Sequence, residues 1–215
     1  SEPPGWSSAI EKGLAMAISG GAAFVDHYAV FGGGACPDIS AESLKKIYFE
    51  KLKEYHPDKR PGSAGVHGQQ VTQALNEAYE ILRDPARREA YDATWRREKE
   101  AALPAFERAE LYRRRGNDLY SKARDVIKGG EHVMNLAVIH QGMALYKSAM
   151  EEYGKAMELA PSDHRLYSNR ALCYLAVEDY HRAFEDARRC THLRPDFKKG
   201  WLLAAKALWK LDRQT

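Results

Sequence analysis

A spacing of 34 residues recurs in the C-terminal half of this chain and restricts the folds that it can adopt. The same distance separates three pairs of residues, which are Pro161 and Pro195, Tyr167 and Trp201, and Ala171 and Ala205. Units that repeat at a fixed period of this size stack on one another, because one unit cannot bury its apolar face alone. The spacing therefore predicts a helical repeat array over residues 105–215, with two repeats and the first helix of a third.

The earlier of the two repeats, which ends at Pro161, is longer than the period allows. Its two halves lie about 21 residues too far apart for a repeat of this class. Gly129 and Gly130 are a predicted turn. Apolar residues then recur at helical spacing from Val133 to Met157. We expect both helices of this repeat to be lengthened, the second to about 30 residues, or about 45 Å.

Four short helices are predicted in residues 24–99, and residues 1–23 form an arm or a short helix. The expected helices span residues 24–31, 41–56, about 69–82, and from 85 onward. Glycines end the first helix, and Pro57 ends the second because proline disfavours helix at the residue before it. Asp84 caps the fourth helix and is followed by a first-turn proline.

The composition is that of a soluble protein with a buried core, since 44% of residues are hydrophobic and 29% are charged. A net charge of +3 does not favour nucleic acid or an anionic membrane as partner, and no apolar stretch is long enough to span a bilayer. Three scattered cysteines favour a reducing compartment, and we expect a cytoplasmic location. No metal-ligand spacing and no glycine-rich phosphate loop occurs, so we expect neither an enzyme nor a cofactor.

The tripeptide His56-Pro57-Asp58 follows the second predicted helix and stands in a characteristic frame. The segments around it are Asp26–Gly32 (DHYAVFG), Leu44–Tyr48 (LKKIY), Leu75–Leu82 (LNEAYEIL) and Asp84–Asp92 (DPARREAYD). In this order and near this spacing, they resemble the J domain of the DnaJ family, over residues 24–95. The resemblance implies a four-helix domain that binds a DnaK-type heat-shock chaperone and accelerates its ATP hydrolysis, while holding no nucleotide itself.

The resemblance also assigns the residues that meet the chaperone, which are His56, Pro57, Asp58, Lys45, Lys46 and Tyr48. Their chemistry suits that role. Pro57 stiffens the loop, Asp58 offers charge-assisted hydrogen bonds to an arginine, and lysines steer an acidic partner surface.

The second helix departs from the family pattern at several positions. Phe49 and Glu50 stand where the family is usually basic, and Glu54 replaces another commonly basic site. Lys51 stands at a usually apolar position. The partner-facing surface is therefore less basic than is usual, which predicts weaker or altered chaperone engagement.

Residues 105–215 resemble tetratricopeptide-repeat (TPR) proteins, whose helix pairs stack around a concave groove. Some of these proteins hold the C-terminal carboxylate of a heat-shock chaperone in a clamp of two lysines, two asparagines and an arginine. Four residues share the clamp's register, which are Arg113, Asn117, Asn169 and Lys199. The fifth position is Leu203, and it marks either a weakened clamp or an apolar groove for an internal client segment.

The sequence thus predicts an all-α protein, with a four-helix J domain followed by an antiparallel helix-pair TPR solenoid. We expect a co-chaperone that couples a DnaK-type chaperone to a second protein or chaperone tail held in the groove. The alternative is a structural subunit of a large assembly, such as a ciliary or organellar complex, in which the J domain has become a docking element.

Overall fold

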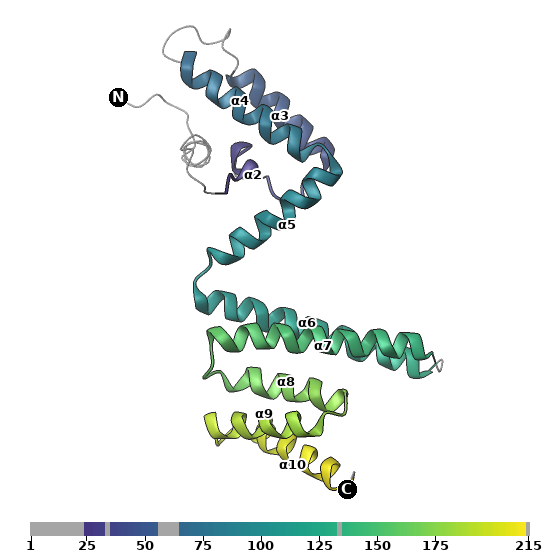
Figure 1. Cartoon of the computed structure of the whole chain (residues 1–215). Coiled ribbons are helices and arrows are strands. Elements are labelled where there is room, and N and C mark those ends of the chain that lie inside the picture. Colours follow the sequence, from purple (N-terminus) through teal and green to yellow (C-terminus); the bar gives the residue numbers. More distant parts are fainter. Residues whose placement is uncertain (1–23, 33–34, 56–64, 133–134, 214–215) are drawn as a thin grey trace. The chain divides into compact units, whose positions relative to one another are not determined.

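The computed structural model describes residues 24–32, 35–55, 65–132 and 135–213 (Figure 1). Every regular element in these ranges is an α-helix, which confirms the all-α prediction. The chain divides into two compact units, one over residues 1–102 and one over residues 103–215. The predicted arm or helix in residues 1–23 and the tripeptide His56-Pro57-Asp58 lie outside the described residues.

The first unit contains four described helices, namely α2 (His27–Val30), α3 (Ala41–Tyr55), α4 (Gly65–Leu82) and α5 (Pro85–Ala101). Asp84 caps α5 as predicted, because its Oδ1 accepts a hydrogen bond from the backbone N–H of Arg87 at 2.9 Å. The helix expected over residues 24–31 is shorter, since Asp26 caps it by accepting from Ala29 N–H. Helix α4 starts four residues earlier than predicted, at Gly65.

The core of this unit lies among α2, α3 and α4, and α5 is held by the packing of Tyr91 and Trp95 against it and by polar contacts. The most deeply buried core residues are Tyr28, Val30, Phe31, Leu44, Val71, Leu75, Ala78 and Leu82. On α5, Trp95 Nε1 donates to Asp26 at 2.9 Å and Lys99 Nζ lies 2.7 Å from the same carboxylate. Burial alone would raise the pKa of Asp26, but these two hydrogen bonds lower it below its ordinary value. One carboxylate therefore both caps α2 and anchors α5.

The second unit is a stack of five described helices, namely α6 (Ala105–His132), α7 (Leu136–Leu159), α8 (His164–Ala176), α9 (Tyr180–Leu193) and α10 (Lys198–Asp212). Successive helices pack against each other, and α6 and α7 run side by side and extend past the end of α8 (Figure 1). Small residues that are fully buried let the helices approach closely. These residues are Ala123, Ala149, Ala156, Ala171, Ala183 and Ala187.

The predicted turn at Gly129 and Gly130 is wrong, because both residues lie inside α6. Helix α6 ends at His132, and Asn135 caps α7 by accepting from the N–H groups of Ala137 and Val138. Helices α6 and α7 form the two arms of a hairpin. They are 28 and 24 residues long, so α7 is shorter than expected. Gly130 is buried against α7, where a Cβ would lie 3.1 Å from Val138. This glycine serves close packing between the arms and does not mark a chain reversal.

Candidate functional site

The surface of α3 that sequence reasoning assigned to a chaperone is basic at both ends. Lys45 and Lys46 are exposed near its start. Lys53 is exposed two turns after Lys45 on the same face, and the sequence analysis did not single it out. Phe49 lies between them with 48% of its surface exposed. We call Lys45, Lys46 and Lys53 the lysine stripe. The eight-residue spacing from Lys45 to Lys53 is the signal in the sequence that identifies it.

Tyr48 lies between α3 and α4 rather than projecting into solvent. Its ring stacks on that of Tyr79 with centroids 4.0 Å apart, and its hydroxyl donates to Asn76 Oδ1 at 2.9 Å. Burial raises the pKa of the Tyr48 phenol. Tyr48 therefore sets the spacing of α3 and α4. It contributes to the predicted chaperone-binding surface by positioning α3.

Two acidic residues of α3 differ in their surroundings. Glu54 lies 2.9 Å from Lys51 Nζ, so each offsets the other's charge. Glu50 is exposed beside the lysine stripe. Glu50 thus reduces the positive potential of this surface, as does Glu42, which is exposed in the first turn of α3.

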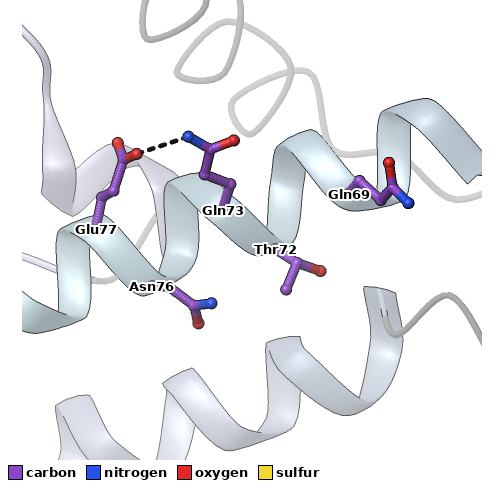
Figure 2. A pocket seen from close by; sticks show the side chains of 5 residues that line it. All are labelled: Gln69, Thr72, Gln73, Asn76 and Glu77. Carbon is purple, nitrogen blue, oxygen red and sulfur yellow. Dashed lines mark hydrogen bonds between the residues drawn. The ribbon is translucent and has the colours of Figure 1, made fainter.

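A shallow hollow lies on α4 next to this region, lined by Gln69, Thr72, Gln73, Asn76 and Glu77 (Figure 2). Figure 2 shows Asn76 directed toward the neighbouring helix, while Gln73 and Glu77 meet on another side, where Gln73 Nε2 donates to Glu77 at 2.9 Å. The lining presents amides, a hydroxyl and one carboxylate.

In the second unit, a line of hydrogen bonds joins four helices. Tyr153 on α7 donates its hydroxyl to Asn117 Oδ1 on α6 at 2.8 Å. Asn169 on α8 donates its Nδ2 to the same oxygen at 3.0 Å. Lys199 on α10 donates its Nζ to Asn169 Oδ1 at 3.2 Å. We call these four residues the polar line, and it includes three of the four residues that the sequence placed in a clamp.

Lys199 differs from the other lysines of the unit in its setting. It is partly buried, and this burial lowers the pKa of its ammonium. Within the described part of the chain, no carboxylate lies within ion-pair distance of its Nζ, and its hydrogen bond goes to a neutral amide. A desolvated cation with a neutral partner retains its capacity to bind an anion.

Arg113, the fourth predicted clamp residue, lies one turn before Asn117 but is engaged elsewhere. Its guanidinium donates two hydrogen bonds to Glu110, from Nε at 2.8 Å and from Nη2 at 2.5 Å. These bonds raise the pKa of Arg113 and lower that of Glu110 to about 2. An incoming carboxylate would have to compete with Glu110 for this cation.

Leu203 is buried, with 4% of its surface exposed, and packs with Ala171, Ala187 and Ala204 inside the stack. Its side chain therefore contributes to stability and offers no surface to an internal client segment. This burial argues against an apolar groove at Leu203, and the clamp that lacks one cation stays a prediction.

The described residues hold no cluster of three or more histidine, cysteine or acidic side chains arranged for a metal ion. Cys173 and Cys190 are buried, and burial raises the pKa of both thiols. Each described helix is too short or too polar to cross a membrane.

Comparison with protein families agrees with this architecture. The family model of the DnaJ domain matches residues 26–92. A model of the tetratricopeptide repeat matches residues 133–163 and residues 164–197. The second of these repeats holds the pair α8 and α9.

Similar proteins include several chaperones. The chain is 44% identical over 63 residues to the heat shock protein sti1 homolog of Schizosaccharomyces pombe, which is 29% of this chain and 11% of that protein. It is 40% identical over 68 residues to the chaperone protein DnaJ of Chlamydia pneumoniae, covering 32% of this chain and 16% of that protein. A U-box domain-containing protein 70 from Oryza sativa subsp. japonica is 29% identical over 140 residues, which is 65% of this chain and 13% of that protein.

These matches span only a small part of each relative, and they concern domains rather than whole proteins. Two independent family models cover consecutive parts of the chain in the order that its sequence predicts. The chain therefore carries a DnaJ domain followed by tetratricopeptide repeats.

Proposed function

We propose that this protein is a co-chaperone that joins two partners. Its DnaJ domain recruits a DnaK-type chaperone and stimulates its ATPase through His56, Pro57 and Asp58. Its repeat unit holds the free carboxylate end of a second protein or chaperone tail. The polar line is the observation that carries this proposal, since it gathers two amides and a cation from α6, α8 and α10 at one place.

The chemistry of the polar line suits a carboxylate. The Lys199 ammonium supplies charge, and the asparagine amides supply directional donors that fix the orientation of a ligand. Partial burial strengthens such contacts, because fewer water molecules compete for them. The engaged state of Arg113 and the leucine at position 203 leave Lys199 as the main anchor for an anion.

A peptide titration tests the groove. A labelled acidic peptide with a free C-terminal carboxylate should bind at least ten-fold more tightly than the same peptide with a C-terminal amide, because the amide loses about 1.5–3 kcal/mol of charge-assisted contact. Equal affinity for the two peptides would contradict the clamp.

Single-turnover ATP hydrolysis by several DnaK-type chaperones tests the DnaJ domain. The wild-type chain should accelerate hydrolysis, and His56→Gln or Asp58→Asn should abolish the effect while the circular dichroism spectrum stays unchanged. If the wild type accelerates none of the chaperones, the J domain is a docking element.

A structural role in a large assembly is the second candidate, and the α6–α7 hairpin favours it. Its arms of 28 and 24 residues are about twice as long as α8 and α9, which have 13 and 14 residues. The projecting end gives an assembly a surface that a peptide groove does not need. Sedimentation of the protein in cell extract separates the two roles, because a subunit migrates with its assembly.

A further inference from the structure

One large apolar side chain of the first unit is exposed, and it lies on α3. Phe49 has 48% of its surface exposed, and every other large exposed hydrophobic residue in the described part of the chain belongs to the second unit. A single exposed apolar residue is common on protein surfaces. The neighbours of Phe49 and the contacts of its ring distinguish it from such a residue.

Lysines surround Phe49 on the surface of α3. Residues three and four positions apart are neighbours on an α-helix. Around Phe49 these four positions hold Lys45, Lys46, Leu52 and Lys53, so three of the four are lysines. All three lysines are exposed, whereas Leu52 is partly buried. Phe49 therefore lies at the centre of the lysine stripe.

The ring of Phe49 packs against a side chain that is itself held in place. It meets the ring of Tyr48 edge-to-face, with centroids 5.2 Å apart and planes inclined by 61°. Tyr48 is fixed in turn by its stacking on Tyr79 and by its hydrogen bond to Asn76. An aromatic ring with a fixed neighbour has little conformational freedom to lose on binding. Phe49 is therefore exposed in an orientation that suits a pocket of defined shape.

These features define the chemistry of a complementary partner. An exposed aromatic ring gains free energy when an apolar pocket buries it, and a few such residues dominate the affinity of many interfaces. The lysines around the ring favour acidic groups at the rim of that pocket. The same lysines oppose contact between two copies of this surface. The exposed carboxylates of Glu42 and Glu50 on α3 weaken its attraction to an anionic membrane.

We propose that Phe49 is the apolar anchor of the α3 surface. Its ring enters an apolar pocket of the partner, and acidic groups at the rim of this pocket meet the lysine stripe. The inference rests on the proposed function, because it takes the partner to be a DnaK-type chaperone. It goes beyond that function, because an aromatic residue at a usually basic position then selects among such chaperones. A chaperone with the pocket binds this chain tightly, and one that offers acidic groups alone binds it weakly.

Binding kinetics separate an apolar anchor from a charge that steers association. The partner is the DnaK-type chaperone that the wild-type chain stimulates most, and stopped-flow measurements give both rate constants. Phe49→Ala should raise the dissociation rate constant by about ten-fold or more and leave the association rate constant within about two-fold, at low and at high salt. Lys53→Ala should instead lower the association rate constant, and this loss should shrink as salt is added.

Phe49→Lys tests the predicted selectivity. It restores the positive charge that is usual at this position in the family. Charge steering alone therefore predicts that Phe49→Lys binds every DnaK-type chaperone more tightly. An anchor predicts about ten-fold weaker binding to the chaperone that the wild type prefers, and equal or tighter binding to chaperones that the wild type binds weakly. Tighter binding of Phe49→Lys to every chaperone would overturn the proposal.

Phe106→Ala is the matched control, because it removes the same ring from a position that is 76% exposed in the second unit. It should leave both rate constants unchanged. Since Phe49 and Phe106 are exposed, both alanine variants should keep the circular dichroism spectrum of the wild type and a Tm within about 4 °C of it.

The failure of the anchor and the failure of the proposed function give different results. Wild-type rate constants in Phe49→Ala, together with loss of ATPase stimulation in His56→Gln, would overturn the anchor and leave the proposed function in place. A wild-type chain that stimulates no DnaK-type chaperone would overturn the proposed function and this inference with it. Binding of the wild type to phosphatidylserine vesicles that Phe49→Ala abolishes would also overturn the inference, since the ring would then enter a membrane.

Discussion

The surface of α3 and the polar line are both candidate binding sites, but they are built differently. The lysine stripe of α3 belongs to one helix, and its side chains act mainly through long-range charge. The polar line takes one residue from each of four helices, and it exists only while those helices are stacked. The first site should therefore respond to local charge and salt, and the second to the stability of the whole repeat unit.

Destabilisation of the repeat unit should produce the largest difference between the activities of the two sites. Met150 is partly buried and packs on the core between α6 and α7, so Met150→Asp places a charge against apolar surface. We expect a loss of about 2–4 kcal/mol in the stability of this unit. Peptide binding should weaken while stimulation of a DnaK-type ATPase is retained.

Denaturant titration with separate fluorescence probes in each unit measures this effect. Lys147→Asp, at an exposed position on the same helix, serves as the matched control and should change stability by less than about 0.5 kcal/mol. Equal loss of both activities in Met150→Asp would show that the two sites are energetically linked.

Removal of the Lys199 ammonium should weaken peptide binding without unfolding the repeat unit. Lys199→Ala deletes the ammonium that donates to Asn169, and we expect a loss of about 1.5–3 kcal/mol for a peptide with a free carboxylate, or at least a ten-fold rise in Kd. Lys198→Ala is the control, because its side chain is exposed and next in sequence. Isothermal titration should show a much smaller change for this variant.

Charge reversal on α3 should act through the rate of association. Glu50→Lys extends the lysine stripe, so binding to a DnaK-type chaperone should tighten by a few-fold at low salt, as expected for about 0.5–1 kcal/mol of exposed electrostatics. Stopped-flow measurements should show that the gain shrinks as salt is added. Glu151→Lys adds the same charge on α7 and should have little effect. Weaker binding by Glu50→Lys would mean that Glu50 contacts the partner directly.

Release of Arg113 from Glu110 should strengthen peptide binding by the repeat unit, with a smaller effect than the changes above. Glu110→Gln removes the carboxylate that holds this guanidinium, and an acidic peptide should bind about two- to five-fold more tightly. Glu107→Gln, at an exposed position one turn earlier, is the matched control. A decrease in affinity would show that Glu110 positions Arg113 for the ligand instead of competing with it.

The same ion pair predicts a weak acid sensitivity of the repeat unit. The folded state lowers the pKa of Glu110 from its ordinary value of 4.5 to about 2. A lowered carboxyl pKa contributes stability above pH 4.5, and that contribution is lost as pH falls toward 2. The thermal unfolding of Glu110→Gln should therefore depend less steeply on pH in this window than that of the wild type.

Sequence reasoning succeeded where local pattern and long-range packing agree. The 34-residue spacing located α8, α9 and α10, and Asp84 correctly marked the start of α5. It failed at Gly129 and Gly130, because Gly130, which permits close packing against α7, has the same local signature as a glycine that permits a turn.

Specific side-chain contacts account for the rest of what was missed. The sequence placed Arg113 in a clamp but did not indicate that Glu110, three residues earlier, would occupy it. The early start of α4 and the short α2 depend on packing within the first unit, including the contacts of Asp26 with α5. The contacts of Asp26 with α5 have no periodic signature, so pattern analysis does not reveal them.

Each hydrogen bond of the polar line has a defined donor and acceptor, so this site is sensitive to the chemistry of the Asn117 side chain. Its Oδ1 accepts from both Tyr153 and Asn169, so an aspartate in its place could keep both hydrogen bonds with an almost identical shape. Replacing the amide nitrogen by oxygen would nevertheless exchange a donor for a negatively charged acceptor. Under the proposed function, Asn117→Asp should therefore weaken the binding of an acidic chain end, while the hydrogen bonds from Tyr153 and Asn169 remain.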